Sequence, residues 1–391
     1  MATTTTTMKS SKQTTLPVGS IILWIILLIG VAAAIVRYSQ GLGSTNLADS
    51  RPWGLWIAFD VMAGVALAAG GFTLAAVVYI FRMKRFYPLI RPTLLTAYIG
   101  YLLAAGSILF DLGRPDRFYH PFFYWNHHSV MFEIAWSVIL YLSILTIENS
   151  QLVLEKYQLK GMLRIVRKIT IPVVIAGIII STAHQSSLGG LFVLMPSQTH
   201  PLWYTPILPV LFYISAIAVG LAMVIVESTL SSSAFNHHVE TRLLSEIGSW
   251  LPMMLGLYLL VNLGNLAFSG KLGLIFEGSL ASFMYLAEII IGVVLPLILL
   301  SMASIRNDRT LLFRSALLVV FGVILNRFNV LVWGQNGAFY APNWVEFAVT
   351  AGLISLGILL YIFAVKNLPV FTDHAPEPEP LPEEAALPAA G

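Results

Sequence analysis

Five ionisable side chains occur within long apolar segments of this 391-residue chain. They are Asp60, Glu133, His184, Glu288 and Arg327. Charged groups inside a bilayer are costly, so they usually face a bundle interior or a cavity and mark a path for protons, ions or substrate. At a rise of about 1.5 Å per residue, all five would lie roughly 5–12 Å below one membrane surface. This common depth predicts one shared buried site; the alternative is that paired charges merely hold helices together.

Asp60 lies in the stretch RPWGLWIAFDVMAGVALAAGGF, residues 51–72. Helical spacing places Trp53, Trp56 and Gly64 on nearly the same face as Asp60. Two indole rings beside a carboxylate could hold a flat apolar ring with polar edges, which makes all three residues candidates for ligand binding. The alternative is that both tryptophans only mark the membrane–water interface.

A polar stripe is predicted on a later helix. Glu133, Ser137, Tyr141 and Glu148 would fall within about 80° of one another, with the two glutamates about 22 Å apart along the helix. Such a stripe favours a proton relay between the two membrane surfaces. Alternatively, the hydroxyl groups only bond to neighbouring helices. Asp111, at the end of another apolar segment, is expected to be a further buried polar group.

The histidines and cysteines narrow the possible cofactors. His184 is the single histidine expected within a span, and with Gln185 it lies in the polar segment STAHQSSLGGLF, where both could donate hydrogen bonds to a ligand. A di-haem cytochrome b anchor needs four axial ligands from its spans, so no haem is predicted. The chain has no cysteine, which excludes disulfides and iron–sulfur clusters bound by its own thiolates. No spacing of His, Asp and Glu indicates a metal site.

The composition is that of an all-α polytopic membrane protein. It is 57% hydrophobic and only 10% charged, whereas soluble domains carry about 25% charged residues. Ten segments reach spanning length. They fall near residues 18–37, 53–81, 93–111, 129–149, 169–187, 207–229, 247–268, 281–304, 311–333 and 344–365. Residues 1–17 are predicted to be a disordered N-terminus, residues 18–366 the membrane domain, and residues 367–391 a disordered, acidic, Pro-rich tail.

The distribution of basic residues predicts the orientation. Of the 22 lysines and arginines, sixteen fall on one side of the ten spans, five on the other, and Arg327 within a span. Basic loops stay in the cytoplasm, so both termini are expected there, in a bacterial inner membrane. The formal charge of +3 therefore concerns topology and lipid, and no nucleic-acid partner is predicted.

Two loops on the other side are aromatic and poor in charge. They contain DLGRPDRFYHPFFYWNHHS and GLFVLMPSQTHPLWYTP. Such segments either lie along the lipid headgroups or form a docking face for a protein partner.

The ordered motifs PWGLWIAFDVMAGVALAAGGF, YPLIRPTLLTAYIGY, SVMFE, HQSSLGGL, HPLW and IRNDRTLLFRSAL resemble the NrfD/PsrC family, in particular its HybB-like branch. The resemblance covers about residues 15 to 370. It implies ten transmembrane helices, arranged as two four-helix bundles plus two extra helices, that hold no redox cofactor. It also implies a periplasmic ferredoxin-like iron–sulfur partner, with hydrogenase small and large subunits beyond it.

The same resemblance implies exchange of electrons with a membrane quinone. In smaller eight-helix relatives, polar groups on the first and fourth core helices contact the quinone, and those positions correspond to Asp60 and His184 here. The expected function is reduction of menaquinone by electrons from an uptake hydrogenase, with Glu133 also taking part in proton transfer. The alternatives are another quinone oxidoreductase on the same scaffold, with a polysulfide, nitrite or cytochrome partner, or an ion-coupled transporter.

Overall fold

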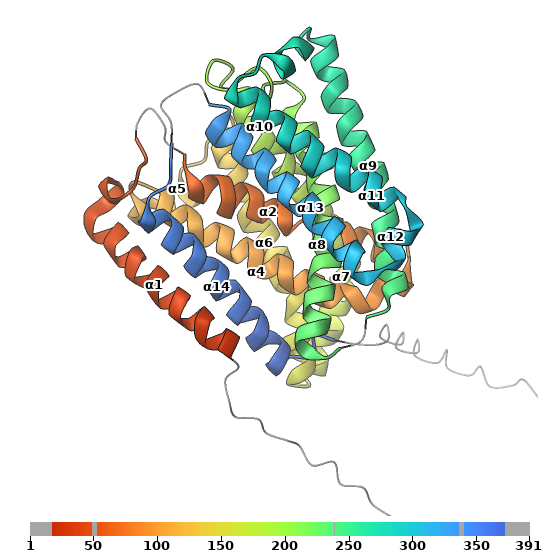
Figure 1. The fold of residues 1–391 in the computed structure, drawn as a ribbon. Coiled ribbons are helices and arrows are strands. Elements are labelled where there is room, and N and C mark those ends of the chain that lie inside the picture. The colour runs from red at the N-terminus through yellow and green to blue at the C-terminus, as the bar shows by residue number, and fades with distance from the viewer. Residues whose placement is uncertain (1–17, 49–52, 238, 336–339, 372–391) are drawn as a thin grey trace, which may run out of the picture.

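The computed structural model describes residues 18–48, 53–237, 239–335 and 340–371 (Figure 1). Within these residues the regular elements are helices, apart from an isolated antiparallel bridge between Thr199 and Gln335. Residues 1–17 and 372–391, which carry most of the two predicted tails, lie outside this range.

The main elements follow one another along the chain. They are α1 (Val18–Gln40), η2 (Trp56–Ala63), α2 (Gly64–Leu67), α3 (Gly70–Ala75), η3 (Ala76–Ile80), α4 (Tyr87–Asp111), α5 (His120–Phe123), α6 (Val130–Lys156), α7 (Lys160–Val193), α8 (Leu208–Phe235), α9 (Thr241–Phe268), α10 (Leu280–Ile289), η7 (Ile290–Val294), α11 (Leu295–Ser301), α12 (Ala303–Asn307), α13 (Arg309–Phe328), η8 (Asn329–Trp333) and α14 (Trp344–Asn367). Short 3-10 turns are η1 (Gly41–Ser44), η4 (Lys84–Phe86), η5 (Pro115–Arg117) and η6 (Leu272–Phe276).

Contacts among the described helices divide them into two groups of four and one outer pair, whose arrangement can be followed in Figure 1. The first group contains the η2–η3 segment, α4, α6 and α7, and the second contains α8, α9, the α10–α11 segment and α13. Helix α8 joins the groups because it packs against α7 and α3 on one side and against α9 and α13 on the other. Helices α1 and α14 pack along each other, and α14 also contacts α4.

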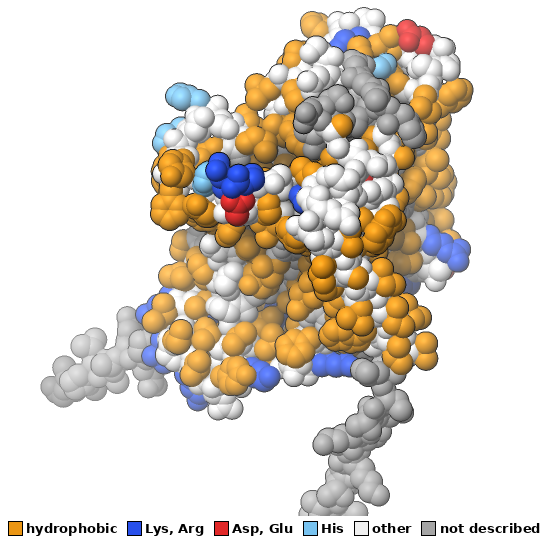
Figure 2. Space-filling view, turned by 90° about the vertical axis from the view of Figure 1, so that its left-hand side faces the viewer, with side chains coloured by type: hydrophobic (Ala, Val, Ile, Leu, Met, Phe, Trp, Pro, Cys, Tyr) orange, Lys and Arg blue, Asp and Glu red, His pale blue; other side chains and the backbone are white. Residues whose placement is uncertain are grey.

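The two ends of the bundle differ in their side chains. We call the end that carries residues 112–129 the aromatic end, and the end that carries residues 81–86 and 156–168 the basic end. Figure 2 shows hydrophobic side chains along the flanks and Lys and Arg side chains gathered at its lower end. Helix α14 begins at the aromatic end with a capping box, in which Asn343 and Glu346 satisfy each other's backbone N–H groups.

Glycines allow close helix crossings. A Cβ added at Gly292 of η7 would lie 2.4 Å from the Cα of Gly322 on α13, and one added at Gly30 of α1 would lie 2.7 Å from the Cα of Gly352 on α14. Neither pair of helices could approach this closely if these glycines carried a side chain. Because no hydrophobic effect drives helices together within lipid, close van der Waals packing at small residues stabilises such crossings.

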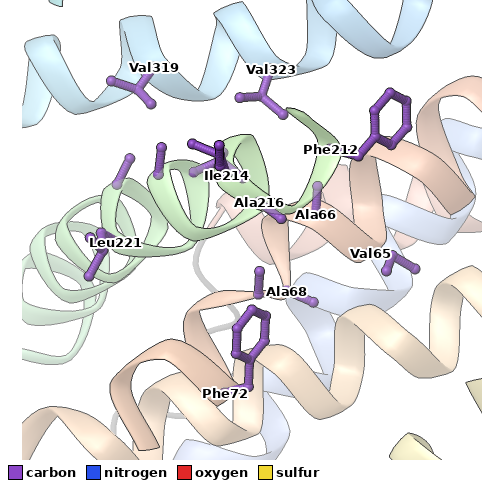
Figure 3. Close-up of a cluster of buried hydrophobic side chains, with 14 of the residues drawn as sticks. Val65, Ala66, Ala68, Phe72, Phe212, Ile214, Ala216, Leu221, Val319 and Val323 are labelled. Atoms are coloured by element: carbon purple, nitrogen blue, oxygen red, sulfur yellow. The ribbon is translucent and has the colours of Figure 1, made fainter. Parts of the chain in front are cut away.

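The apolar core follows α8. Phe212, Ala216 and Leu221 of α8 lie between Val65 and Phe72 of the second predicted span and residues of α13 (Figure 3). These side chains are nearly or completely buried. The core therefore connects the two groups of helices into one body.

The second predicted span is not a continuous α-helix. Its first turns, Trp56–Ala63, and its last, Ala76–Ile80, are π-helical, and the chain turns at Ala68 and Ala69 between α2 and α3. In a π-helix the hydrogen bonds run from residue i to i+5, and such segments are frequent at functional sites. The segment that contains Asp60 therefore has non-α geometry.

The all-α polytopic fold is confirmed, whereas the count of ten spans is not. Among the described residues, nine helices are long and apolar enough to cross a membrane. The predicted span 169–187 lies within the 34-residue α7, which is outside that set. Residues 368–371, which the sequence assigns to the tail, extend beyond α14, and Val370 packs with Leu95 and Leu152 with only 1% of its surface exposed.

Candidate functional site

Asp60 lines a cavity of about 530 Å³. The cavity is bounded by residues of η2, α2, α4, α8 and α14. Asp60 itself is buried, with 8% of its surface exposed. Ligand pockets usually measure about 300–1,000 Å³ and are lined by apolar side chains with a few polar groups. The cavity has these properties.

Polar groups mark the two ends of this cavity. At the end of the cavity that is nearer the aromatic end of the bundle, the Thr350 hydroxyl donates a hydrogen bond of 2.8 Å to Oδ2 of Asp60. At the basic end, the Tyr361 hydroxyl donates to Glu227 and lies 3.1 Å from Oγ of Ser231. Thr350 and Tyr361 are eleven residues apart on α14, so the two ends are about 16 Å apart.

The middle of the cavity is apolar and has room beside Asp60. Leu67, Leu103, Met223 and Val226 are among the side chains that line it. A Cβ added at Gly64 would meet only the carbonyl oxygen of Phe59 in its own helix, at 3.5 Å. The space next to Asp60 therefore exists partly because residue 64 has no side chain.

His184 lies in a different buried cluster. It is completely buried, and neither ring nitrogen has a hydrogen-bond partner among the described residues. Its ring centroid is 5.8 Å from that of Tyr101, which in turn is 4.6 Å from that of Tyr141. His184 thus joins the polar stripe of α6 through Tyr101 of α4.

The expected single site of five ionisable groups is wrong. Asp60 lines the cavity, whereas His184 does not. Gln185 does not face the cavity either, because its amide donates to the carbonyl oxygen of Val65 at 3.0 Å. The structure separates the groups because each packs against a different helix, which depth alone cannot reveal.

The predicted pair of indole rings is not found beside the Asp60 cavity. Trp53 packs edge-on against Phe192 at 6.0 Å, whereas Trp56 is buried and lies 6.0 Å from Phe110. Neither lines the Asp60 cavity. Residues 56–63 are π-helical, so a projection at about 100° per residue misplaces side chains along this segment.

The stripe on α6 is only partly buried. Ser137, Tyr141 and Glu148 are buried, with 7%, 1% and 8% of their surfaces exposed. Glu133 is exposed and accepts a hydrogen bond of 2.5 Å from the Ser187 hydroxyl, so its expected burial is wrong. It lies in the first turn of α6, where one side of the helix end is uncovered.

Glu288 and Arg327 belong to the second group of helices. Glu288 accepts hydrogen bonds from Trp203 at 3.0 Å, from Asn326 at 2.8 Å and from Asn329 at 2.6 Å. Tyr258 donates a longer bond of 3.4 Å. The Arg327 guanidinium stacks 3.7 Å from the Phe212 ring centroid and donates to Asn326 and Ser215. This network joins α8, α9, α10, α13 and η8.

Asp111 is partly buried at the aromatic end of α4. It lies close to Arg37, whose guanidinium donates to the carbonyl oxygens of Phe110 and Leu112 at 2.8 and 2.9 Å. A cation at a helix C-terminus satisfies carbonyls and complements the helix dipole. Arg37 therefore attaches α1 to α4.

The loop of residues 112–129 exposes aromatic side chains. Phe123, Tyr124 and Trp125 are 73%, 70% and 57% exposed. The same loop carries an exposed ion pair, because Arg114 donates two hydrogen bonds to Asp116 at 3.0 and 2.9 Å. These hydrogen bonds hold the pKa of the Asp116 carboxyl below its usual value. In contrast, Trp203 of the second predicted docking loop is 4% exposed.

Several of these residues were missed by the sequence analysis. Thr350 and Tyr361 belong to the last span, which carries no charged residue between Glu346 and Lys366. Glu227 lies near a helix end, where a charge reaching toward the surface is the ordinary interpretation. Among the described residues, no group of three or more His, Cys, Asp or Glu side chains is placed to hold a metal ion.

The sequence that forms this buried carboxylate, apolar cavity and π-helical segment resembles those of known proteins. The family model described as polysulphide reductase, NrfD, matches residues 43–338. The chain belongs to the NrfD family. The predicted resemblance is therefore confirmed over most of the chain.

Curated relatives extend beyond that region. A protein of Nitratidesulfovibrio vulgaris is 35% identical over 371 residues, which cover 91% of this chain and 95% of the relative. The probable Ni/Fe-hydrogenase 2 b-type cytochrome subunit of Escherichia coli K12 is 32% identical over 345 residues, or 85% of this chain and 87% of the relative. The integral membrane subunit of a menaquinone reductase of N. vulgaris is 28% identical over 380 residues, or 88% and 90%. This member of the NrfD family therefore shares nearly its whole length with membrane subunits of oxidoreductases.

Proposed function

We propose that the chain is a quinone-binding membrane subunit that passes electrons from a partner iron–sulfur subunit to menaquinone. The observation that carries the proposal is the apolar cavity of about 530 Å³ with Asp60 at one end. A quinone ring needs a polar group at a carbonyl oxygen and apolar walls elsewhere, and the cavity supplies both. Two relatives, named as subunits of a hydrogenase and of a menaquinone reductase, support this assignment.

The chemistry assigned to this chain is binding and proton delivery. Reduction of one quinone to quinol consumes two electrons, which come from the partner, and two protons. Asp60 is proposed to bind and orient the ring, and a carboxyl group within hydrogen-bond distance of a carbonyl oxygen can act in proton transfer. Thr350 holds one carboxylate oxygen of Asp60, so the other oxygen is available to the ring.

Protons are proposed to travel along the stripe of α6 and the cluster around His184. Glu148, Tyr141 and Ser137 are buried on that helix, and the Tyr101 ring packs against both Tyr141 and His184. The basic end is proposed to face the cytoplasm, because basic loops remain on the cytoplasmic side. Both termini are then cytoplasmic, and the membrane is proposed to be the bacterial inner membrane. Protons would then enter near Glu148.

The partner is proposed to be an iron–sulfur subunit docked in the periplasm on the aromatic end. Exposed aromatic side chains with few net charges are typical of interface cores. Hydrogenase small and large subunits would lie beyond it, as the name of the E. coli relative suggests.

The test uses membranes that contain the assembled complex. Asp60→Asn removes the carboxyl proton chemistry and keeps the shape of the side chain. We expect donor-to-quinone electron transfer to fall about a hundredfold, as for loss of a correctly placed catalytic group, while donor-to-dye electron transfer by the partner persists. Equal loss of both activities would mean that Asp60 acts in assembly, and normal quinone reduction would refute the proposed site.

A further inference from the structure

The Asp60 cavity has an opening on one side. Four of its lining residues are exposed, and they lie on two facing helices: Leu230 (55%) and Ala234 on α8, and Ile354 (42%) and Ile358 (43%) on α14. The other lining residues are buried or partly buried. Helices α8 and α14 meet through Tyr361 at the basic end and are not packed along their middle. The opening lies in this gap.

On α14 the opening lies at the middle of the helix, whereas Leu230 and Ala234 lie in the last two turns of α8, which ends at Phe235. Ile354 follows the first residue of α14, Trp344, by ten positions, which corresponds to about 15 Å. Asn367 ends the helix thirteen positions later, about 20 Å further. Since the hydrocarbon core of a bilayer is about 30 Å thick, an opening at this position faces acyl chains and not water.

The side chains that line the cavity define which ligand could pass through the opening. Its middle is apolar, and its polar groups lie at the two ends. At the basic end, Glu227 is bonded by Tyr361, which also contacts Ser231 at 3.1 Å, so these groups close the cavity there. At the other end, Asp60 has a hydrogen bond to Thr350 through Oδ2, and Gly64 leaves space beside it. A suitable ligand has one polar head and a long apolar remainder.

We propose that the gap between α8 and α14 is the lateral access route for an isoprenoid quinone, with the ring at Asp60 and the tail leaving past Leu230, Ile354 and Ile358. The proposal rests on the proposed function and adds the route and the orientation of the ligand. Ile354 and Ile358 follow Thr350 by four and eight residues, so the opening begins about 6 Å from the ring site and ends about 12 Å from it. This length accommodates a ring inside the cavity with its tail in lipid. A tailless quinone does not depend on this route for its anchorage.

The first experiment maps the tail by cross-linking. A quinone that carries a photoreactive diazirine on its first isoprenoid units is irradiated with the complete complex in bilayers of stated phospholipid composition. We expect labelled peptides from residues 223–235 and 353–362, and loss of the label when unlabelled menaquinone is added. Labelling of α6 or α7 instead would overturn the route, and so would labelling of α8 and α14 that menaquinone does not displace, because the occupant would then be an ordinary acyl chain.

The second experiment narrows the opening. Ile354→Trp combined with Ile358→Trp places two indoles at its edge, whereas Leu360→Trp and Phe363→Trp on α14 are controls at exposed positions outside the cavity. We expect turnover with long-tailed menaquinone to fall about tenfold in the double variant, with turnover of a tailless naphthoquinone changed less than about twofold. Both controls should resemble the wild type.

The outcomes separate the route from the function. Normal turnover of the long-tailed quinone in the double variant, or equal loss with both quinones, would overturn the access route, while the Asp60→Asn result would still decide the site. If Asp60→Asn leaves quinone reduction intact, the proposed function fails whatever the double variant does.

Discussion

The hydroxyl of Thr350 donates a hydrogen bond of 2.8 Å to Oδ2 of Asp60, although the two residues are 290 positions apart. It connects α14, one helix of the outer pair, to the π-helical segment η2. Asp60 is therefore held by a helix outside the two four-helix groups. This contact orients the carboxylate toward the cavity and makes Thr350 a positioning residue.

Thr350→Val removes the donor and keeps the size of the side chain. We expect quinone-linked turnover to fall about three- to tenfold, the equivalent of one ordinary hydrogen bond, with the main effect on KM because ring orientation is disturbed. Thr350→Ser restores the hydroxyl and should recover most of the activity. Equal loss in the Val and Ser variants would show that packing at residue 350, and not the hydrogen bond, matters.

Glu148 should matter more to proton uptake than Glu133. Glu148 is buried and interacts electrostatically with Tyr141 and Tyr79, whereas Glu133 is exposed and bonded to Ser187. Each is changed to Gln and the complex is reconstituted in liposomes. We expect Glu148→Gln to reduce both turnover and membrane voltage by about tenfold, and Glu133→Gln to have a smaller effect. Full turnover and voltage in both variants would leave the stripe with a packing role.

Glu288 is expected to stabilise the second group of helices and not to bind quinone. Glu288→Leu leaves the Trp203 indole and the Asn326 and Asn329 amides without their acceptor, which should cost on the order of 3 kcal/mol and lower the midpoint of thermal unfolding. Glu277→Leu, at an exposed position, is the control. Unchanged unfolding together with lost quinone reduction would instead return Glu288 to the active site.

The exposed aromatic loop is expected to hold the partner. Phe123→Asp combined with Tyr124→Asp should release the iron–sulfur subunit in mild detergent, because charge at an interface core opposes burial. Tyr157→Asp, at a 63% exposed position of the basic end, is the matched control. If the partner co-purifies equally with all three proteins, the aromatic loop is not the docking surface.

The fold follows from features that the sequence displays directly. Apolar segments of spanning length predict the helices and their order, because lipid requires every backbone polar group to bond within a helix. The family resemblance supplied the pairing of the groups. Asp60 was found for the same reason, since a carboxylate in an apolar segment is conspicuous.

The hydrogen-bond partners of the buried carboxylates could not be predicted from the sequence. Thr350, Tyr361 and Trp203 meet Asp60, Glu227 and Glu288 across 290, 134 and 85 positions, and one sequence contains no signal for such pairs. The face of Trp56 was misplaced because α-helical periodicity does not hold in a π-helix, and Trp53 precedes η2, which begins at Trp56. Depth could be estimated from residue number, but rotation about each helix could not.

The central claim is that quinone binds in the cavity beside Asp60, and filling the cavity tests it most directly. Gly64→Leu inserts a side chain into the open space, whereas Gly106→Leu inserts the same side chain outside the cavity lining, where an added Cβ meets nothing within 4 Å. Menaquinone binding is measured by equilibrium titration of the purified complex. We expect Gly64→Leu to weaken binding by about tenfold or more while subunit composition and thermal unfolding stay as in Gly106→Leu. Wild-type affinity in a stable Gly64→Leu complex would contradict the account.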